Sequence, residues 1–110
     1  MISRGEVARK QAEAHWSLGK REKMLLAWKQ ELEAQIATLR ERRTELLNQR
    51  DYLALKIECF DNWNLENCLM LKNDYIKHYY DLDAEIFKIE AEILFHEEIL
   101  DKVFAESRRS

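Results

Sequence analysis

Proline is absent from this chain, and glycine occurs only twice in 110 residues. Loops, hairpin turns and barrel corners draw their backbone angles from these two residues, so their scarcity disfavours sheets, β-barrels and doubly wound folds. The composition is instead rich in Ala, Glu, Lys, Leu and Arg, as in long helices and coiled coils. The length allows at most one domain, and two helices of this size enclose only a thin core.

Long apolar runs are also missing. None approaches the roughly 20 residues that cross a bilayer, and the start of the chain has no signal-peptide pattern, so we expect a cytoplasmic protein. The two cysteines, Cys59 and Cys68, fit neither a zinc nor a thioredoxin-type spacing. We expect reduced thiols, with a disulfide across a turn as the alternative.

The net charge of −3 predicts no general affinity for nucleic acid. The two halves differ in sign, however. Residues 1–60 hold twelve Lys/Arg against nine Asp/Glu, and residues 61–110 hold six against twelve. A basic segment and an acidic segment attract each other when they lie side by side, which favours pairing of the two halves.

A ladder of apolar residues at strict seven-residue spacing runs through the first half, as in a coiled-coil seam. The row four residues further on is mixed, with Ile36 beside Arg43 and Arg50, so this is not a simple leucine zipper. Long arginine stems are able to cover such a seam while their charged ends reach water. The ladder consists of Leu18, Leu25, Leu32, Leu39, Leu46, Leu53 and Phe60.

The second half carries two apolar rows that alternate by three and four residues. These rows are Tyr79, Ile86, Ile93 and Leu100, and Leu82, Ile89, His96 and Val103. A further group widens the apolar face beyond what one partner helix covers, which suggests a third helix from another copy or another protein. This group is Tyr80, Phe87, Leu94 and Phe95.

The predicted organisation is a single module. It has a frayed or overhanging helical N-terminus (1–17), a basic helix (18–60), a turn (61–64) and an acidic helix (65–107). Ser3 and Glu6 have capping-box spacing, and Asp61 or Asn64 is expected to cap the second helix. The fold class is all-α: an antiparallel two-helix hairpin of coiled-coil type, completed by oligomerisation or a partner helix. A turn near residues 62–63 pairs Leu46 with Tyr79 and Leu25 with Leu100.

Little in the sequence carries chemistry. No glycine-rich phosphate loop is present, and two rods offer no pocket for catalysis. Glu92 and His96, and Asp74 and His78, have helical i,i+4 spacing but lack the Glu-x-x-His pairs of a di-iron bundle. We expect no catalytic residues, no metal and no cofactor, and therefore no enzyme. His96 is interpreted as a packing residue of the seam.

Basic residues gather in the first helix at Arg40, Arg42, Arg43 and Arg50. One interpretation is a solvated face whose charges pair with the acidic helix. The other is a docking patch for an anionic surface such as a microtubule or an acidic membrane. Trp63, in the predicted turn, is the best candidate for an aromatic anchor.

The segment from Tyr79 to Leu100 resembles the long-helix region of the JMY/WHAMM group of WASP-related actin nucleation-promoting factors. The resemblance rests mainly on Glu92-Ile93-Leu94, then Glu97-Glu98-Ile99-Leu100, and on Arg43-x-Glu45-Leu46 upstream. It spans about residues 42–103 and implies a coiled coil that self-associates and contacts microtubules. The chain has no proline-rich stretch and no WH2-like or acidic actin/Arp2/3 tail, so no nucleating activity is expected of it.

Three functions follow as hypotheses. The first is a non-enzymatic assembly or docking module of a cytoskeletal or membrane-trafficking protein, whose partner is a second copy or another helical protein. The second is a basic-patch binder of a microtubule or an acidic lipid surface. The third is a structural subunit of a multi-helix complex.

Overall fold

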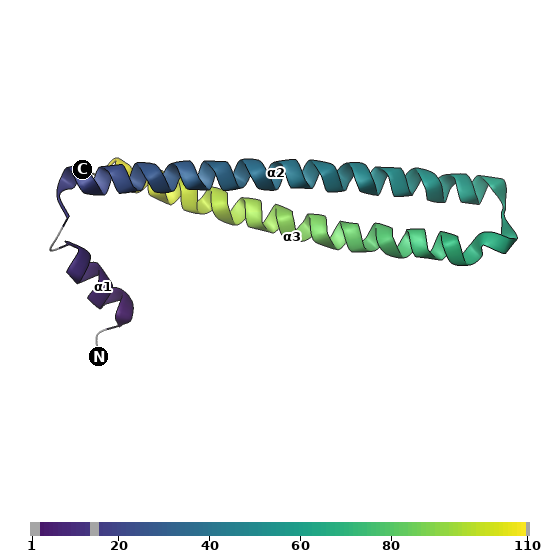
Figure 1. Ribbon diagram of the computed structural model, residues 1–110, viewed down its shortest axis with the longest axis horizontal. Helices are drawn as coiled ribbons and strands as arrows, with labels where there is room; N and C mark the ends of the chain where they lie inside the picture. Colours follow the sequence, from purple (N-terminus) through teal and green to yellow (C-terminus); the bar gives the residue numbers. More distant parts are fainter. Residues whose placement is uncertain (1–2, 14–15, 110) are drawn as a thin grey trace.

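The computed structural model describes residues 3–13 and 16–109, and all its regular elements there are helical. In chain order they are α1 (Arg4–Glu13), α2 (Leu18–Trp63), the 3₁₀ turn η1 (Glu66–Cys68) and α3 (Leu69–Ser107). Figure 1 shows α2 and α3 running antiparallel, with α1 set off at the end opposite the turn. The molecule measures 72 × 31 × 15 Å. The predicted all-α helical hairpin is confirmed.

Serine side chains start the first two helices. The backbone N–H of Glu6 donates to Ser3 Oγ over 3.1 Å, and that of Lys20 donates to Ser17 Oγ over 3.2 Å. Each bond satisfies one of the amide donors that a helix N-terminus leaves without an intrahelical partner. The predicted capping role of Ser3 is therefore present. Among the described elements α1 packs against none of the others, so this segment lies apart from the hairpin.

The turn lies later in the chain than the predicted 61–64. Helix α2 continues through Asp61 to Trp63 and ends at Asn64, whose φ of 52° and ψ of 49° are left-handed. Asparagine tolerates this conformation better than other residues with a Cβ. Asn64 therefore ends the first long helix instead of capping the second, and α3 begins at Leu69 after η1, without a side-chain cap. The expected capping by Asp61 or Asn64 is wrong.

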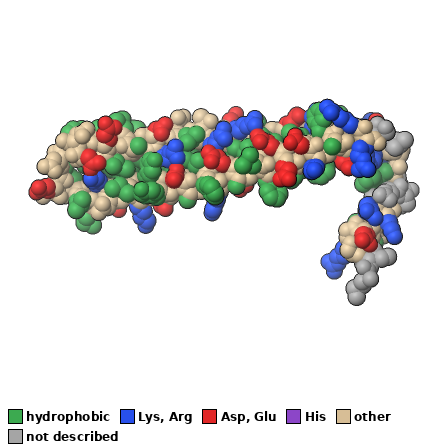
Figure 2. Space-filling model, turned by 180° about the vertical axis from the view of Figure 1, so that it is seen from behind, with side chains coloured by type: hydrophobic (Ala, Val, Ile, Leu, Met, Phe, Trp, Pro, Cys, Tyr) green, Lys and Arg blue, Asp and Glu red, His purple; other side chains and the backbone are tan. Residues whose placement is uncertain are grey.

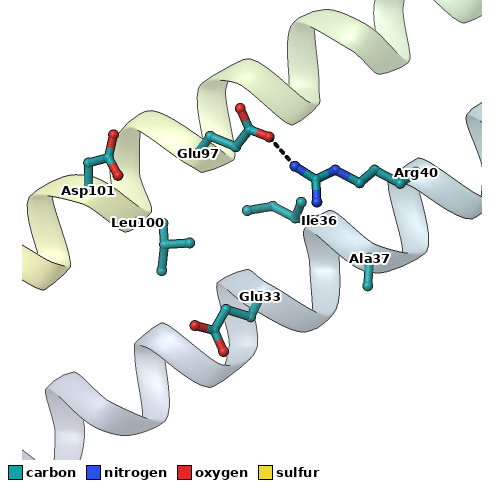
Figure 3. Close-up of a pocket in the computed structure, with 7 residues that line it drawn as sticks. All are labelled: Glu33, Ile36, Ala37, Arg40, Glu97, Leu100 and Asp101. Carbon is teal, nitrogen blue, oxygen red and sulfur yellow. Dashed lines mark hydrogen bonds and ion pairs between the residues drawn. The ribbon is translucent and has the colours of Figure 1, made fainter.

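The later turn changes the pairing of the two helices. Tyr79 was expected opposite Leu46, but its ring lies 5.9 Å from the guanidinium carbon of Arg50 and lines a surface groove together with Ile57. Likewise Leu100 lies beside Ile36 instead of Leu25 (Figure 3). The midpoint of the connection between α2 and α3 lies at about residue 66 instead of the predicted 62–63. In an antiparallel pair, moving this midpoint by one residue changes the partner of every residue by two positions. The predicted register is wrong by about one heptad, the step after which the same rows face each other again.

The core is a single line of side chains between α2 and α3. Each predicted seam residue whose side chain the structure describes is buried or half-buried, and the side chain of Leu18 lies outside the described part. The buried members are Leu32, Leu46, Leu53, Leu82, Ile86, Ile89, Ile93 and Val103. The half-buried members are Leu25, Leu39, Phe60, Tyr79, His96 and Leu100.

Three contributors to the core were not predicted: Ile36, Tyr75 and Leu47, of which Leu47 is half-buried and packs against the core cluster. Ile36 is only 4% exposed, although its row is interrupted by arginines. Tyr75 packs against the core cluster, and its ring lies 5.5 Å from that of Phe60. Ile36 and Tyr75 both stand at seam spacing: Ile36 follows Leu32 by four residues within the mixed row, and Tyr75 precedes Leu82 by one heptad. In the described part of the chain, no helix is both long and apolar enough to cross a membrane.

Candidate functional site

Ion pairs link the two long helices along most of their length. Arg21 contacts Glu106 over 2.8 Å, and Arg40 contacts Glu97 over 2.6 Å. Nearer the turn, Lys72 of α3 pairs with Asp61 of α2. Except for this last pair, the base comes from α2 and the acid from α3, as the charge difference between the two halves predicts.

The basic residues proposed as a docking patch mostly face this seam. Arg42 lies 3.4 Å from Glu85 of α3 and 3.3 Å from Glu45 of its own helix. Arg50 donates to Asp83 over 2.6 Å. This hydrogen bond raises the pKa of Arg50 above its ordinary value, because it stabilises the charged guanidinium.

Arg43 is half-buried in the mixed row of α2. With Arg40, Arg42 and Arg50 bound to carboxylates of α3, the geometry favours the intramolecular interpretation of this patch. Arg50 is half-buried, and its guanidinium reaches α3, where it lies 5.9 Å from the ring centroid of Tyr79, as expected of a long side chain in a mixed row.

A shallow groove of about 390 Å³ lies beside the Arg40–Glu97 pair (Figure 3). Ile36 and Leu100 form its apolar floor, and the carboxylates of Glu33 and Asp101 stand on opposite sides. In Figure 3 the Arg40 guanidinium points toward Glu97, with which it forms the ion pair. The groove thus lies beside the core, with the Arg40–Glu97 ion pair among its lining residues.

The outer face of α3 carries large apolar side chains that the hairpin leaves uncovered. We call Tyr80, Phe87, Leu94 and Phe95 the α3 outer stripe; they are 64%, 74%, 67% and 66% exposed. They follow the helix at spacings of seven and eight residues, so they share one face, away from the buried rows. Figure 2 shows hydrophobic side chains reaching the surface along the hairpin, especially in the half near the turn.

A second exposed apolar group surrounds the turn. Trp63 is 64% exposed and touches Phe60 edge-on, with ring centroids 6.2 Å apart. Met70 is 84% exposed, and Leu65, Leu69 and Leu71 are also exposed. The structure therefore places the predicted anchor Trp63 at the surface, on the end of the rod, where a partner is able to reach it.

The other candidate residues are placed as follows. His96 is half-buried, and its Nδ1 lies 2.7 Å from the carbonyl oxygen of Glu92 in the preceding turn, so the ring is held against its own helix. Cys59 and Cys68 are half-buried free thiols. Within the described residues, no three His, Cys, Asp or Glu side chains gather in a way that could hold a metal ion.

Comparison with models of protein families, with curated proteins and with solved structures found no match to this chain.

Proposed function

We propose that the chain is a non-enzymatic coiled-coil module for assembly or docking in a cytoskeletal or membrane-trafficking protein. The α3 outer stripe is the observation that carries the proposal. A hairpin that needed only its own seam would have polar side chains on this face, and contiguous exposed apolar surface is typical of interaction sites. Large aromatic side chains are also the residues that most often dominate binding energies.

The shape of the molecule supports the same function. Two long helices with a thin seam form a rod, which suits spacing and joining other parts better than enclosing a substrate. The resemblance of residues 42–103 to the JMY/WHAMM group supports the cytoskeletal part of the proposal. A cytoplasmic location is part of the proposal as well.

Co-sedimentation of the full chain with microtubules, and separately with acidic lipid vesicles, tests the docking role. The double variant Phe87→Glu/Leu94→Glu disrupts the centre of the stripe. The control Leu26→Glu/Leu55→Glu adds the same two charges to α2, at residues that are 53% and 55% exposed. We expect binding that the double variant loses and the control keeps. A wild-type chain that binds neither itself, nor microtubules, nor vesicles contradicts the proposal.

The same experiment distinguishes docking through the α3 outer stripe from the alternative, binding of an anionic surface through the arginines of α2. Binding that survives the double variant but disappears as salt is raised points to the arginines, since exposed charges are screened over about 8–10 Å at ordinary ionic strength. Binding that resists salt and disappears with the stripe points to apolar docking.

A further inference from the structure

The face of α3 that carries the outer stripe continues as an unbroken 3–4 pattern at both ends. Going along the chain, the positions are Lys77, Tyr80, Ala84, Phe87, Ala91, Leu94 and Glu98. All of these residues are exposed in the hairpin. This is the spacing of a seam, on the opposite side of a helix that already has one.

The pattern is nearly symmetric about its centre. Large residues alternate with the small residues Ala84 and Ala91, and the face begins with a cation and ends with an anion. Neither Lys77 nor Glu98 has an ion-pair partner among the residues that the structure describes. A helix face with opposite charges at its two ends complements a second copy of itself that runs in the opposite direction.

We infer that the α3 outer stripe is the contact between two copies of this chain, which pair antiparallel through their α3 helices. Near Phe87 the two-fold axis crosses the face, and Lys77 of each copy lies beside Glu98 of the other. In this register Phe87 of one copy lies beside Phe87 of its partner, and Ala84 lies opposite Ala91, so the helices approach closely at the alanines. A parallel pair would instead set Lys77 against Lys77 and Glu98 against Glu98, which is unfavourable.

The area is sufficient for a stable pair. An aromatic side chain buries about 150–250 Å² when fully covered. Three aromatic rings and one leucine, each about two-thirds exposed, therefore offer roughly 500 Å² per copy, or roughly 1,000 Å² in total. This reaches the lower limit of specific interfaces before Ala84, Ala91 and the terminal charges are included.

Light scattering coupled to size-exclusion chromatography, over a series of protein concentrations, tests the inference. Wild type is expected to form a dimer that dissociates on dilution. Phe87→Glu/Leu94→Glu is expected to raise the dissociation constant by about 30-fold or more, the size of a hot-spot loss. Leu26→Glu/Leu55→Glu, which adds two charges at exposed residues of α2, is the matched control and keeps the dimer. Circular dichroism of each variant verifies that the helices remain, because the substituted residues lie outside the core.

Charge exchange tests the antiparallel direction. Lys77→Glu alone and Glu98→Lys alone each place like charges together, and each is expected to weaken the dimer about 3- to 10-fold at low salt. An equal mixture of the two single variants, and the chain with both changes, are expected to regain wild-type association. If single charge changes have no effect while the Phe87 variant dissociates, the antiparallel arrangement is overturned.

The inference rests on the proposed docking function, but the two fail separately. A chain that remains monomeric at every concentration overturns self-pairing, and so does a dimer that resists the double variant. Microtubule or vesicle binding by such a monomer leaves the docking function standing with a different partner. If the wild-type chain forms a dimer that Phe87→Glu/Leu94→Glu dissociates, but binds neither microtubules nor vesicles, self-assembly is the function of the stripe.

Discussion

At the scale of single residues, the seam contains fully buried apolar side chains and half-buried arginines whose charged ends bind carboxylates of the other helix. Leu46 is 1% exposed and is the most deeply buried side chain of the core. Four residues later, half-buried Arg50 binds Asp83 of α3 with its guanidinium. Deleting apolar atoms and deleting charges should therefore have unequal effects on stability.

Leu46→Ala is expected to lower the free energy of unfolding by about 2–5 kcal/mol, because it removes buried methyl groups and leaves a cavity. Leu55→Ala, at a surface position of the same helix, should change it by less than about 0.5 kcal/mol. Urea unfolding followed by circular dichroism at a fixed protein concentration measures both. Equal effects of the two substitutions would contradict the assigned seam.

The carboxylate of Glu106 gives the hairpin an acid dependence. Arg21 and Arg109 both donate hydrogen bonds to it, at 2.8 and 3.0 Å, and lower its pKa below the ordinary 4.5. A depressed folded-state pKa means that this stabilisation is complete above the unfolded pKa and disappears as the pH falls through the lower, folded value.

In Glu106→Gln the free energy of unfolding should therefore fall less steeply as the pH is lowered below about 4.5. Near neutral pH the substitution should leave the pH dependence almost unchanged. Thermal unfolding at pH 7, 5, 4 and 3 measures it, and added salt should shrink the difference. Glu98→Gln is the control, since Glu98 has no ion pair in the described hairpin. An identical acid response of both variants would contradict the role of Glu106.

At the scale of the elements, α2 and α3 are unequal partners. Helix α2 has 46 residues and contributes one complete apolar row plus a mixed one, whereas α3 has 39 residues and two nearly complete rows. Helices within a folded protein gain most of their stability from packing of their apolar faces rather than from helix propensity. The element that decides which residues pack is the connection at Asn64, because its position determines the register.

Asn64→Ala is expected to destabilise the hairpin by about 1 kcal/mol, because a Cβ residue other than Asn or Asp is strained in the left-handed region. Asn64→Gly should be neutral or slightly stabilising. Asn62, which lies within α2, is the matched control: Asn62→Ala should stabilise slightly through its higher helix propensity. Thermal unfolding of the three variants measures these changes, and a harmless Asn64→Ala would mean that α2 does not end there.

At the scale of the whole molecule, the protein is a thin rod with most of its surface in solvent. Helix α1 contributes nothing to the described packing of α2 and α3. The rod therefore depends on one seam and its flanking ion pairs, and further burial has to come from outside the hairpin. This is the physical reason for placing the function at the exposed face of α3.

Removing residues 1–16 is expected to change the free energy of unfolding by less than about 0.5 kcal/mol, because Ser17, which caps α2, is retained. Removing residue 17 as well should cost about 1 kcal/mol more through loss of that cap. Differential scanning calorimetry of the two shortened chains at equal concentration separates these effects. A large loss on removing 1–16 would show that α1 supports the hairpin.

Much of the architecture was predictable from local pattern. The absence of proline and the scarcity of glycine indicate long helices. The seven-residue ladder from Leu25 to Phe60 and the rows of the second half indicate which faces of these helices are buried. The opposite charges of the two halves predict ion pairs in which α2 supplies the base and α3 the acid, as in Arg40–Glu97. The outer residues Tyr80 and Phe87 were already identified as surplus to a two-helix seam.

Only the tertiary structure decided the register of the two helices, the position of the turn and the ion-pair partners of the arginines. A heptad pattern repeats, so sliding one helix by seven residues keeps the same rows in contact and the sequence alone does not distinguish the alternatives. The choice depends on where α2 ends, and that depends on the left-handed Asn64 and on Phe60 packing against Tyr75, which is distant in sequence. Once the register is set, Arg42 and Arg50 lie opposite carboxylates of α3, while the outer stripe of that helix is left facing solvent.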